Sequence, residues 1–525
     1  MSQELLSRIA LAAFVLSAPA IAQAASKSEL VLAVQGESEQ GYDPTLGWGE
    51  YGHPLFQSTL LTRGADLQTQ PDLAKSWTLS DDRLTWTVQI RDDARFSDGS
   101  ALTAADVAFT FNQAAKSGGA VDLTALDRAT ADGASTVVLR LKEPRITFAE
   151  SFYTLGIVPQ KGYGPNYGRQ PIGSGPYRLV RWDRGQQLLV DANPFFYGAK
   201  PAFTKLTFLF TGEDTTFAAA SAGKLDVAAV PAALAERVPS GMKRVVARTV
   251  DNRGLVFPML PNTGRKTPNG AAIGNDVTAD KAIRLAINIA IDRRALVSGV
   301  LLGHGTPAYG PADTLPWSNP EDRLPDADPA RAAQILDDAG WKMSAAGVRT
   351  KGGREARFSV LYFADDSTRQ MLALAVAEML RPLGIVLEPL GKSREEVARL
   401  RHANVVLYGW GSHNPLEVYE LYDSKLAGTE SYNTGFYANP KVDAYFAAAQ
   451  NAPSFEASLP YWRDAEWDGE TGYGVRGDAA WAWLVNLEHV YFVNACIDVG
   501  RVQVEPHGHG WPITAGILNW RWTCN

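Results

Sequence analysis

Cysteine, net positive charge and long apolar runs are all scarce in this chain. Its two cysteines in 525 residues exclude a disulfide-rich scaffold and zinc modules built on paired cysteine motifs. With 50 Lys and Arg against 57 Asp and Glu, the formal charge is −7, without the basic excess of a nucleic-acid-binding surface. After residue 24 no apolar run approaches the roughly 20 residues that span a bilayer. We therefore expect about two to four globular domains and no nucleic-acid partner.

Signatures of the common enzyme classes are missing as well. The chain has no nucleophile elbow, no HExxH pair and no Walker loop. The glycine-rich stretch at 173–176 is too short for a phosphate cradle and lacks the lysine. We therefore expect no catalytic residues, with an enzyme that has a scattered active site as the rival interpretation.

The first 24 residues have the pattern of a secretory signal peptide. Arg8 precedes the apolar run 9–18, and residues 22–24 (AQA) fit the small-x-small cleavage pattern, so the mature chain starts near Ala25. The apolar run is about half the length of a membrane span, which argues against an anchor. No cysteine lies at the cleavage site, so we expect a periplasmic protein that is not a lipoprotein.

The two cysteines, Cys496 and Cys524, both lie near the C-terminus. In an oxidising compartment outside the cytoplasm they can pair, and the chain-entropy model gives such a loop roughly 3–4 kcal/mol of stabilisation. Their spacing leaves the pairing open.

Strand-like and helix-like stretches alternate along the chain without an internal repeat. Residues 84–90 alternate apolar and polar side chains, which predicts a strand with one buried face. Residues 280–299 predict one amphipathic helix, because Ile283, Ile287 and Ile291 are four residues apart. This alternation of strands and helices favours an α/β architecture.

A series of short motifs follows one another along most of residues 40–525. In chain order they are 71–77 (PDLAKSW), 84–87 (LTWT), 91–99 (RDDARFSDG), 103–107 (TAADV), 171–177 (PIGSGPY), 193–198 (NPFFYG) with 200–201 (KP), 222–226 (AGKLD) and 339–341 (AGW). Each motif is weak alone, but the ordered set is specific. Together they resemble the large peptide- and nickel-binding family, family 5, of periplasmic solute-binding proteins that serve ABC importers.

The resemblance implies an α/β fold of two lobes joined by a hinge, with the ligand enclosed in an interlobe cleft. We expect residues 25–250 together with 485–525 to form a discontinuous lobe I, with a sub-domain at about 54–168. Residues 251–484 are expected to form lobe II. The resemblance further implies a receptor, expected to be a monomer, that hands a small ligand to the permease subunits of an ABC importer at the inner membrane.

The loop 408–415 (YGWGSHNP) is the first expected ligand contact, because the resemblance places it at the cleft. We expect Trp410 and Asn414 to touch the ligand. Peptide-binding relatives carry an aspartate about three residues after the tryptophan, and this chain has His413 there. A neutral imidazole is a poor partner for a buried ammonium but a common metal ligand. Glu417 is the alternative source of a carboxylate.

The tail motif 506–512 (PHGHGWP) is the second expected contact. His507 and His509 can both reach one ion if the backbone turns, which the flanking glycines allow. With 467–469 (WDG) and 481–487 (WAWLVNL), this tail resembles the subgroup of nickel- and metallophore-type binders. A hydrogen-bonded tail loop far from the cleft is the open alternative.

The N-terminal loop around residues 42–53 approaches the ligand from the first lobe in the same family. Trp48 and Tyr51 are expected to stack on the ligand, and Glu50 to meet a cation. His53, just before a proline, is more plausibly structural.

The ligand class stays open between a nickel ion held by a small chelator or metallophore and a short peptide. The histidine at position 413 favours the chelated metal, with His413, His507 and His509 as its candidate protein ligands. No resident cofactor is expected. Of the other histidines, His489 is expected to be packed, and His304 and His402 to lie on the surface.

Overall fold

The computed structural model describes residues 27–34, 36–38, 40–117, 121–429, 431–508 and 510–524. The predicted signal peptide and His509 therefore lie outside the described residues. Within these ranges, no helix combines the length and apolar character needed to cross a membrane.

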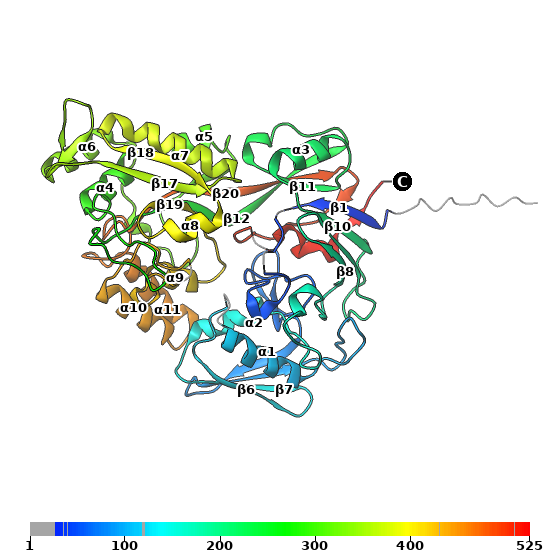
Figure 1. Cartoon of the computed structure of the whole chain (residues 1–525). Coiled ribbons are helices and arrows are strands. Elements are labelled where there is room, and N and C mark those ends of the chain that lie inside the picture. The colour runs from blue at the N-terminus through cyan, green and yellow to red at the C-terminus, as the bar shows by residue number, and fades with distance from the viewer. Residues whose placement is uncertain are drawn as a thin grey trace, which may run out of the picture.

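One mixed sheet of eleven strands runs through both halves of the molecule (Figure 1). In order across the sheet, the strands are β18 (Val386–Lys392), β17 (Arg357–Phe363), β19 (Val405–Tyr408), β12 (Met242–Val256), β20 (Trp481–Asn494), β11 (Val227–Val230), β1 (Glu29–Ala33), β10 (Lys205–Leu209), β9 (Gln187–Ala192) and β8 (Tyr177–Asp183), with β13 (Gly305–Pro307) beside β20. The long antiparallel strands β12 and β20 pair along most of their length. Strand β12 also pairs with β19 on its other side, and β20 pairs with β11. These two long strands therefore join the halves.

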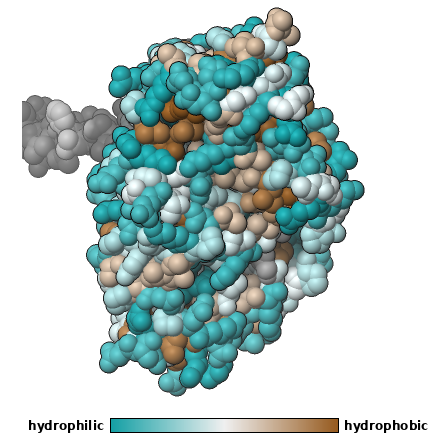
Figure 2. All heavy atoms as spheres, turned by 90° about the vertical axis from the view of Figure 1, so that its left-hand side faces the viewer, coloured by the Kyte–Doolittle hydropathy of each residue, from teal (hydrophilic) through white to brown (hydrophobic). Residues whose placement is uncertain are grey.

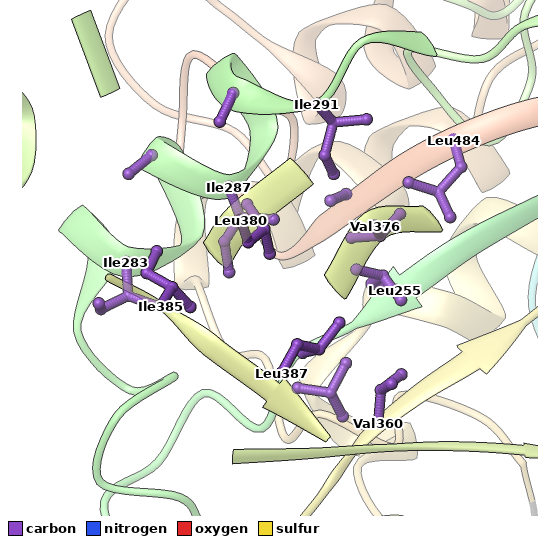
Figure 3. Close-up of a cluster of buried hydrophobic side chains, with 14 of the residues drawn as sticks. Leu255, Ile283, Ile287, Ile291, Val360, Val376, Leu380, Ile385, Leu387 and Leu484 are labelled. Carbon is purple, nitrogen blue, oxygen red and sulfur yellow. The ribbon is translucent and has the colours of Figure 1, made fainter. Parts of the chain in front are cut away.

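Helices cover the sheet in the half formed by β17, β18 and β19. They are α4 (Lys281–Ala290), α5 (Arg293–Gly299), α6 (Pro329–Asp338), α7 (Ser367–Leu380), α8 (Arg394–Leu400), α9 (Leu416–Tyr422), α10 (Pro440–Gln450) and α11 (Phe455–Glu466). The fully buried side chain of Ile287 on α4 lies beside Leu380 of α7, and that of Ile283 lies beside Ile385 (Figure 3). Leu484 joins the same cluster from β20, so the long strand is part of this core.

The helix predicted over 280–299 is two helices in the structure. Helix α4 ends at Ala290, and α5 begins at Arg293, because the chain is extended at Ile291. The Asp292 carboxylate accepts the backbone N–H of Ala295 at 2.8 Å and so caps the second helix. Ile291 remains fully buried, so the apolar spacing identified a core face correctly while the helix was predicted too long.

A second sheet and its helix form a separate core below the main sheet in Figure 1. The strands lie in the order β4 (Ala74–Leu79), β5 (Thr85–Ile90), β7 (Thr136–Leu141) and β6 (Leu126–Asp132), and α1 (Ala104–Ser117) packs against them. The core residues come from positions 60–157, and Val88 and Phe111 are fully buried within it. The predicted strand at 84–90 is confirmed.

The remaining half draws its core from both ends of the chain. Leu30 and Leu206 pack in one cluster with Tyr491 and Trp511, and helix α3 (Glu213–Ser221) lies beside β11. The smaller elements are α2 (Ser151–Thr154), the pairs β2 (Leu61–Arg63) with β3 (Thr69–Pro71) and β21 (Ile497–Asp498) with β22 (Arg521–Trp522), and the sheet β14 (Lys342–Met343), β15 (Arg349–Lys351) and β16 (Arg354–Glu355). The predicted lobe boundaries stay a prediction, because β12 and β20 pass between the halves without a break.

The outer face that Figure 2 presents is mainly hydrophilic, and its hydrophobic residues form small separate groups. The large apolar side chains instead fill the cores described above. On this face the apolar surface is scattered in the way expected of ordinary protein surface.

The sequence left the pairing of the cysteines open, and the structure joins them. Cys496 and Cys524 form a disulfide with their Cα atoms 5.1 Å apart, beside the short pair of β21 and β22. The bond closes a loop of the tail that includes Trp511, whose side chain is almost fully buried.

Replacing both cysteines by serine is expected to lower the free energy of unfolding by about 3 kcal/mol, because the open tail gains conformational entropy in the unfolded chain. Denaturant titration of the wild type with and without reductant measures the effect. The double serine variant is the control, since reductant should not change its midpoint. Equal stability of the oxidised wild type and the variant would contradict this expectation.

Candidate functional site

A cavity of about 1350 Å³ lies between the two halves of the molecule and the 60–157 sub-domain. Its lining comes from the loop 46–51 and the tail on one side, and from β12, α9 and the end of β19 on the other. The sub-domain contributes Asp122 and Glu150. Hydrogen bonds that join the two sides run from Thr147 to Gln450, from Arg83 to the carbonyl of Asn451 and from the N–H of Ser367 to Glu213.

Three predicted contacts from the N-terminal loop line this cavity: Trp48, Glu50 and Tyr51. The Trp48 ring is 8% exposed, and its Nε1–H donates to the carbonyl of Pro54 at 2.7 Å. It packs edge-on against Trp511, with ring centroids 5.0 Å apart. Trp48 is therefore a rigid part of the wall, whereas Glu50 and Tyr51 are only half-buried.

Two predicted contacts from the 408–415 loop, Trp410 and Asn414, also line the cavity. The Trp410 ring lies 6.2 Å from that of Tyr432, and its buried Nε1–H has no hydrogen-bond partner among the described residues. Asn414 accepts the backbone N–H of Leu416 at 2.9 Å and so holds the start of α9 in place. The loop thus offers an aromatic surface with one unused donor.

His413 does not belong to the lining that the structure describes, although its neighbours Ser412 and Asn414 do. Burial first, and then the charges of Arg63 and His53, lower the pKa of His413 to about 3. The predicted ligand contact of His413 stays a prediction.

Two further histidines are neutral and buried. Burial lowers the pKa of His53 to about 4, and its ring lies 3.2 Å from the amide oxygen of Gln503. His402 is 3% exposed and bonds the carbonyl of Thr434, so its predicted surface position is wrong. His304 is half-buried, 3.5 Å from each of two carboxylates.

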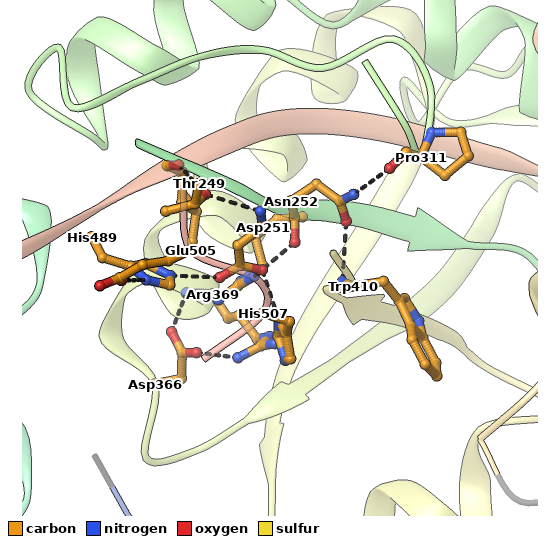
Figure 4. A network of polar contacts seen from close by, with 12 residues as sticks. Thr249, Asp251, Asn252, Pro311, Asp366, Arg369, Trp410, His489, Glu505 and His507 are labelled. Atoms are coloured by element: carbon orange, nitrogen blue, oxygen red, sulfur yellow. Dashed lines mark hydrogen bonds and ion pairs between the residues drawn. The ribbon is translucent and has the colours of Figure 1, made fainter. Parts of the chain in front are cut away.

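A polar network surrounds Asp251, where β12 bulges and its register with β20 shifts (Figure 4). The buried carboxylate lies 2.6 Å from the Arg253 guanidinium and 2.6 Å from Nδ1 of His507. His489 of β20 contacts Asp251 at 3.0 Å and Glu505 of the tail at 2.7 Å. His489 was expected to be merely packed; in the structure it lines the cavity and links three segments of the chain.

The network fixes the charges of its members. Burial opposes ionisation of Asp251, but the charge of Arg253 and the hydrogen bonds to His489 and His507 hold its pKa well below the usual range. Burial would lower the pKa of His489, yet the hydrogen bonds to Asp251 and Glu505 raise it to about 9. Burial lowers the pKa of His507. At neutral pH, His489 is therefore a cation and His507 a neutral ring.

Three glutamates form a separate acidic group on the cavity wall: Glu50, Glu417 and Glu420. Burial raises the pKa of Glu50 to about 7 and that of Glu417 to about 8. Burial, and then the charges of Asp122, Glu417 and Glu50, raise the pKa of Glu420 well above its usual value. Glu417, the alternative carboxylate in the sequence, is 5% exposed and reaches the cavity.

Three arginines, Arg253, Arg369 and Arg401, line another part of the cavity. Each has a buried Nε–H without a hydrogen-bond partner in the part of the chain that the structure describes. Burial and the charge of Arg253 lower the pKa of Arg369 to about 10, and Asp366 pairs with it. No sequence motif marks these residues.

Of the three predicted metal ligands, the structure describes His413 and His507, and the metal site stays a prediction. His413 lies outside the lining, His507 is held by Asp251, and His509 lies outside the described residues. Across the described ranges, no group of three His, Cys, Asp or Glu residues could hold a metal ion.

We expect His489 to make stability depend on pH between about 6.5 and 9. Its folded-state pKa of about 9 lies above the ordinary value of 6.5, so its stabilisation is fully present below pH 6.5. This stabilisation is lost as the pH rises through 9. The free energy of unfolding of the wild type, measured relative to His489→Gln, should fall by on the order of 1–3 kcal/mol across this window.

His402→Gln is the matched control, because burial lowers the pKa of His402 and keeps it neutral over the same range. Its free energy of unfolding should change with pH as that of the wild type does. If the difference in the free energy of unfolding between the wild type and His489→Gln does not change with pH, His489 is not charged in the folded protein.

Comparison with known proteins agrees with this architecture. Residues 68–433 match the family described as bacterial extracellular solute-binding proteins, family 5 (middle). Protein XP55 of Streptomyces lividans is 33% identical over 497 residues, which cover 91% of this chain and 86% of that protein. The nickel-binding periplasmic protein of Escherichia coli is 26% identical, covering 66% of this chain and 68% of its own length.

Among solved structures, NikZ from Campylobacter jejuni in complex with Ni(L-His) superposes with a TM-score of 0.83 at 23% identity, over 94% of this chain and 99% of that one. AppA from Bacillus subtilis, in complex with a nonapeptide, gives 0.79 at 21% identity, over 95% and 99%. These likenesses show the two-lobed fold expected from the sequence motifs. On the family match and the relative of 33% identity, the chain belongs to the bacterial extracellular solute-binding proteins of family 5.

Proposed function

We propose that this protein is the extracytoplasmic receptor of an ABC importer, which captures a small charged solute and delivers it to the permease at the inner membrane. The observation that carries the proposal is the cavity of about 1350 Å³, walled by aromatic and charged side chains from both halves. Members of its family bind small ligands and work with such permeases. Lobe closure retains the ligand and no bond is broken.

The proposal includes the export of the protein and its location in the cell. The N-terminal 24 residues act as a signal peptide, and the mature chain is a periplasmic monomer. The disulfide between Cys496 and Cys524 supports this, because such bonds persist in oxidising compartments.

An organic solute with amino-acid or peptide-like charges fits the cavity better than a metal ion held by protein histidines. The wall offers glutamates and arginines, whereas His413 is not among its lining residues. The second candidate is a metal chelate that brings its own donors, and His507 is a predicted imidazole that lines the cavity. Relatives named for oligopeptide binding and for nickel binding support both classes.

Native mass spectrometry of protein purified gently from its own host tests the function. The expected result is a small solute that leaves on denaturation and is recovered chemically unchanged, which separates a receptor from an enzyme. A metal in the released material would favour the chelate. A deletion strain that keeps every small-molecule uptake rate would contradict the receptor function.

We expect Trp410→Ala to weaken binding of the co-purified solute about tenfold or more, because alanine removes an aromatic wall and its donor. Isothermal titration measures the loss, and the melting temperature of the ligand-free protein should barely change, since Trp410 is only half-buried. Tyr461→Ala is the control, because Tyr461 is exposed and is not part of the cavity lining. Equal losses in both variants would remove Trp410 from the binding site.

A further inference from the structure

The 60–157 sub-domain contacts the carboxyl end of helix α10, which belongs to the other half of the molecule (Figure 1). Arg83 donates from its Nη1–H to the backbone carbonyl of Asn451, the residue that follows α10, at 2.5 Å. Carbonyl groups at the carboxyl end of a helix lack partners within the helix and carry a partial negative charge. The last turn of α10, which the structure describes in full, contains no basic residue. The cation at this helix end therefore comes from the opposite half.

The backbone of Arg83 has a conformation that favours glycine. Its φ of 59° lies in the left-handed region, in the turn between β4 and β5. The N–H of Arg83 closes this turn by donating to the carbonyl of Ser80 at 2.8 Å. Glycine would adopt this conformation without strain, and a strained residue kept in such a place points to a role beyond its own turn. The contact with Asn451 supplies that role.

A second hydrogen bond joins the same two elements. The Thr147 hydroxyl donates to Oε1 of Gln450, the last residue of α10, at 3.3 Å. Thr147 is 4% exposed and Gln450 is 6% exposed. Water is thus largely excluded from these side chains, so the sub-domain and the end of α10 meet closely.

A corresponding contact lies between α3 and α7, in the upper part of Figure 1. The Glu213 carboxylate on α3 accepts the N–H of Ser367, the first residue of α7, at 3.4 Å. Among the described residues of its first turn, α7 has no acidic side chain, and its N-cap Asp366 accepts the N–H of Arg369 instead. A carboxylate is stabilising at the positive end of a helix. Two helix ends in one half thus each receive the matching charge from the other half.

We propose that Arg83 and Glu213 form a latch, in which each side chain caps a helix end of the opposite half and stabilises the closed arrangement of the molecule. The closed arrangement is the one described here, in which both contacts are made. The inference rests on the proposed receptor function and concerns how its closure is regulated.

The latch acts through the balance between two arrangements. Its contacts are lost when the halves move apart, so their free energy favours the closed arrangement alone and raises the ratio of closed to open molecules. Part of the free energy of closure then comes from the protein itself and adds to what a bound solute contributes. Arg83 does not belong to the cavity lining that the structure describes, so a substitution there acts on closure without removing a wall of the cavity.

Pulsed electron paramagnetic resonance on the full mature chain measures the distance across the Arg83 contact. Nitroxide labels at Asp132→Cys in the sub-domain and at Glu456→Cys on α11 lie on the two sides, and both positions are exposed. The two native cysteines are joined in the disulfide, so the label reacts with the introduced cysteines. Unfolding and refolding with the disulfide intact removes co-purified solute. The wild type should then retain a population at the closed distance.

Arg83→Gln should lower the ratio of closed to open molecules about threefold, because the neutral, shorter side chain loses the contact with α10. Arg128→Gln is the matched control, because it makes the same charge change in the same sub-domain and Arg128 pairs with its neighbour Asp127. This control should keep the wild-type ratio. Glu213→Gln should have a smaller effect than Arg83→Gln, since the amide oxygen still accepts a hydrogen bond, and the two effects should multiply in the double variant because the sites are separate.

Arg83→Gly separates the latch from a purely local role in the turn. Glycine relieves the left-handed strain, so the melting temperature should be unchanged or higher. The ratio of closed to open molecules should nevertheless fall as it does in Arg83→Gln. A residue that only supports its own turn would leave that ratio unchanged.

The latch is overturned if Arg83→Gln and Arg83→Gly keep the wild-type distances, if Arg128→Gln opens the molecule equally, or if the wild type without solute has no closed population. These distances are measured without any ligand. Native mass spectrometry of the co-purified solute tests the receptor function separately, so the two failures are distinguishable.

Discussion

A buried carboxylate at the bulge between the two long paired strands joins three segments of this structure. Asp251 lies in the bulge of β12, and its ionised form requires positive or donating partners because it is shielded from water. Arg253 comes from the same strand, His489 from β20 and His507 from the tail. Satisfying one charge thus brings together three segments that are far apart in the chain, and the cavity wall forms around their junction.

The fold was largely predictable because its signals are local or ordered along the chain. Apolar spacing at Ile283 and Ile287 identified a core face, and the alternation at 84–90 identified a half-buried strand. The ordered motifs pointed to the two-lobed family that the comparisons confirm. The break at Asp292 was not predicted, because a capping carboxylate and an ordinary acidic residue on a helix surface look the same in one sequence.

The candidate site was predictable only in part. Motif position brought Trp48, Tyr51 and Trp410 to the cavity, but it did not determine which way His413 points. Side-chain direction depends on how a loop leaves its strand, and burial depends on partners from distant segments. Arg253, Arg369 and Arg401 carry no motif, because they come from separate segments that meet at the cavity only in the folded chain.

The position of β20 determines the order in which this molecule can assemble. The strand lies between β11 and β12, and its residues enter the cores of both halves, with Tyr491 on one side and Leu484 on the other. It occupies positions 481–494 of a 525-residue chain. Neither half can complete its sheet until nearly all of the polypeptide is available, and such long-range strand pairing is slow to form. A chain made from its N-terminus therefore stays incompletely folded until β20 is available to both halves.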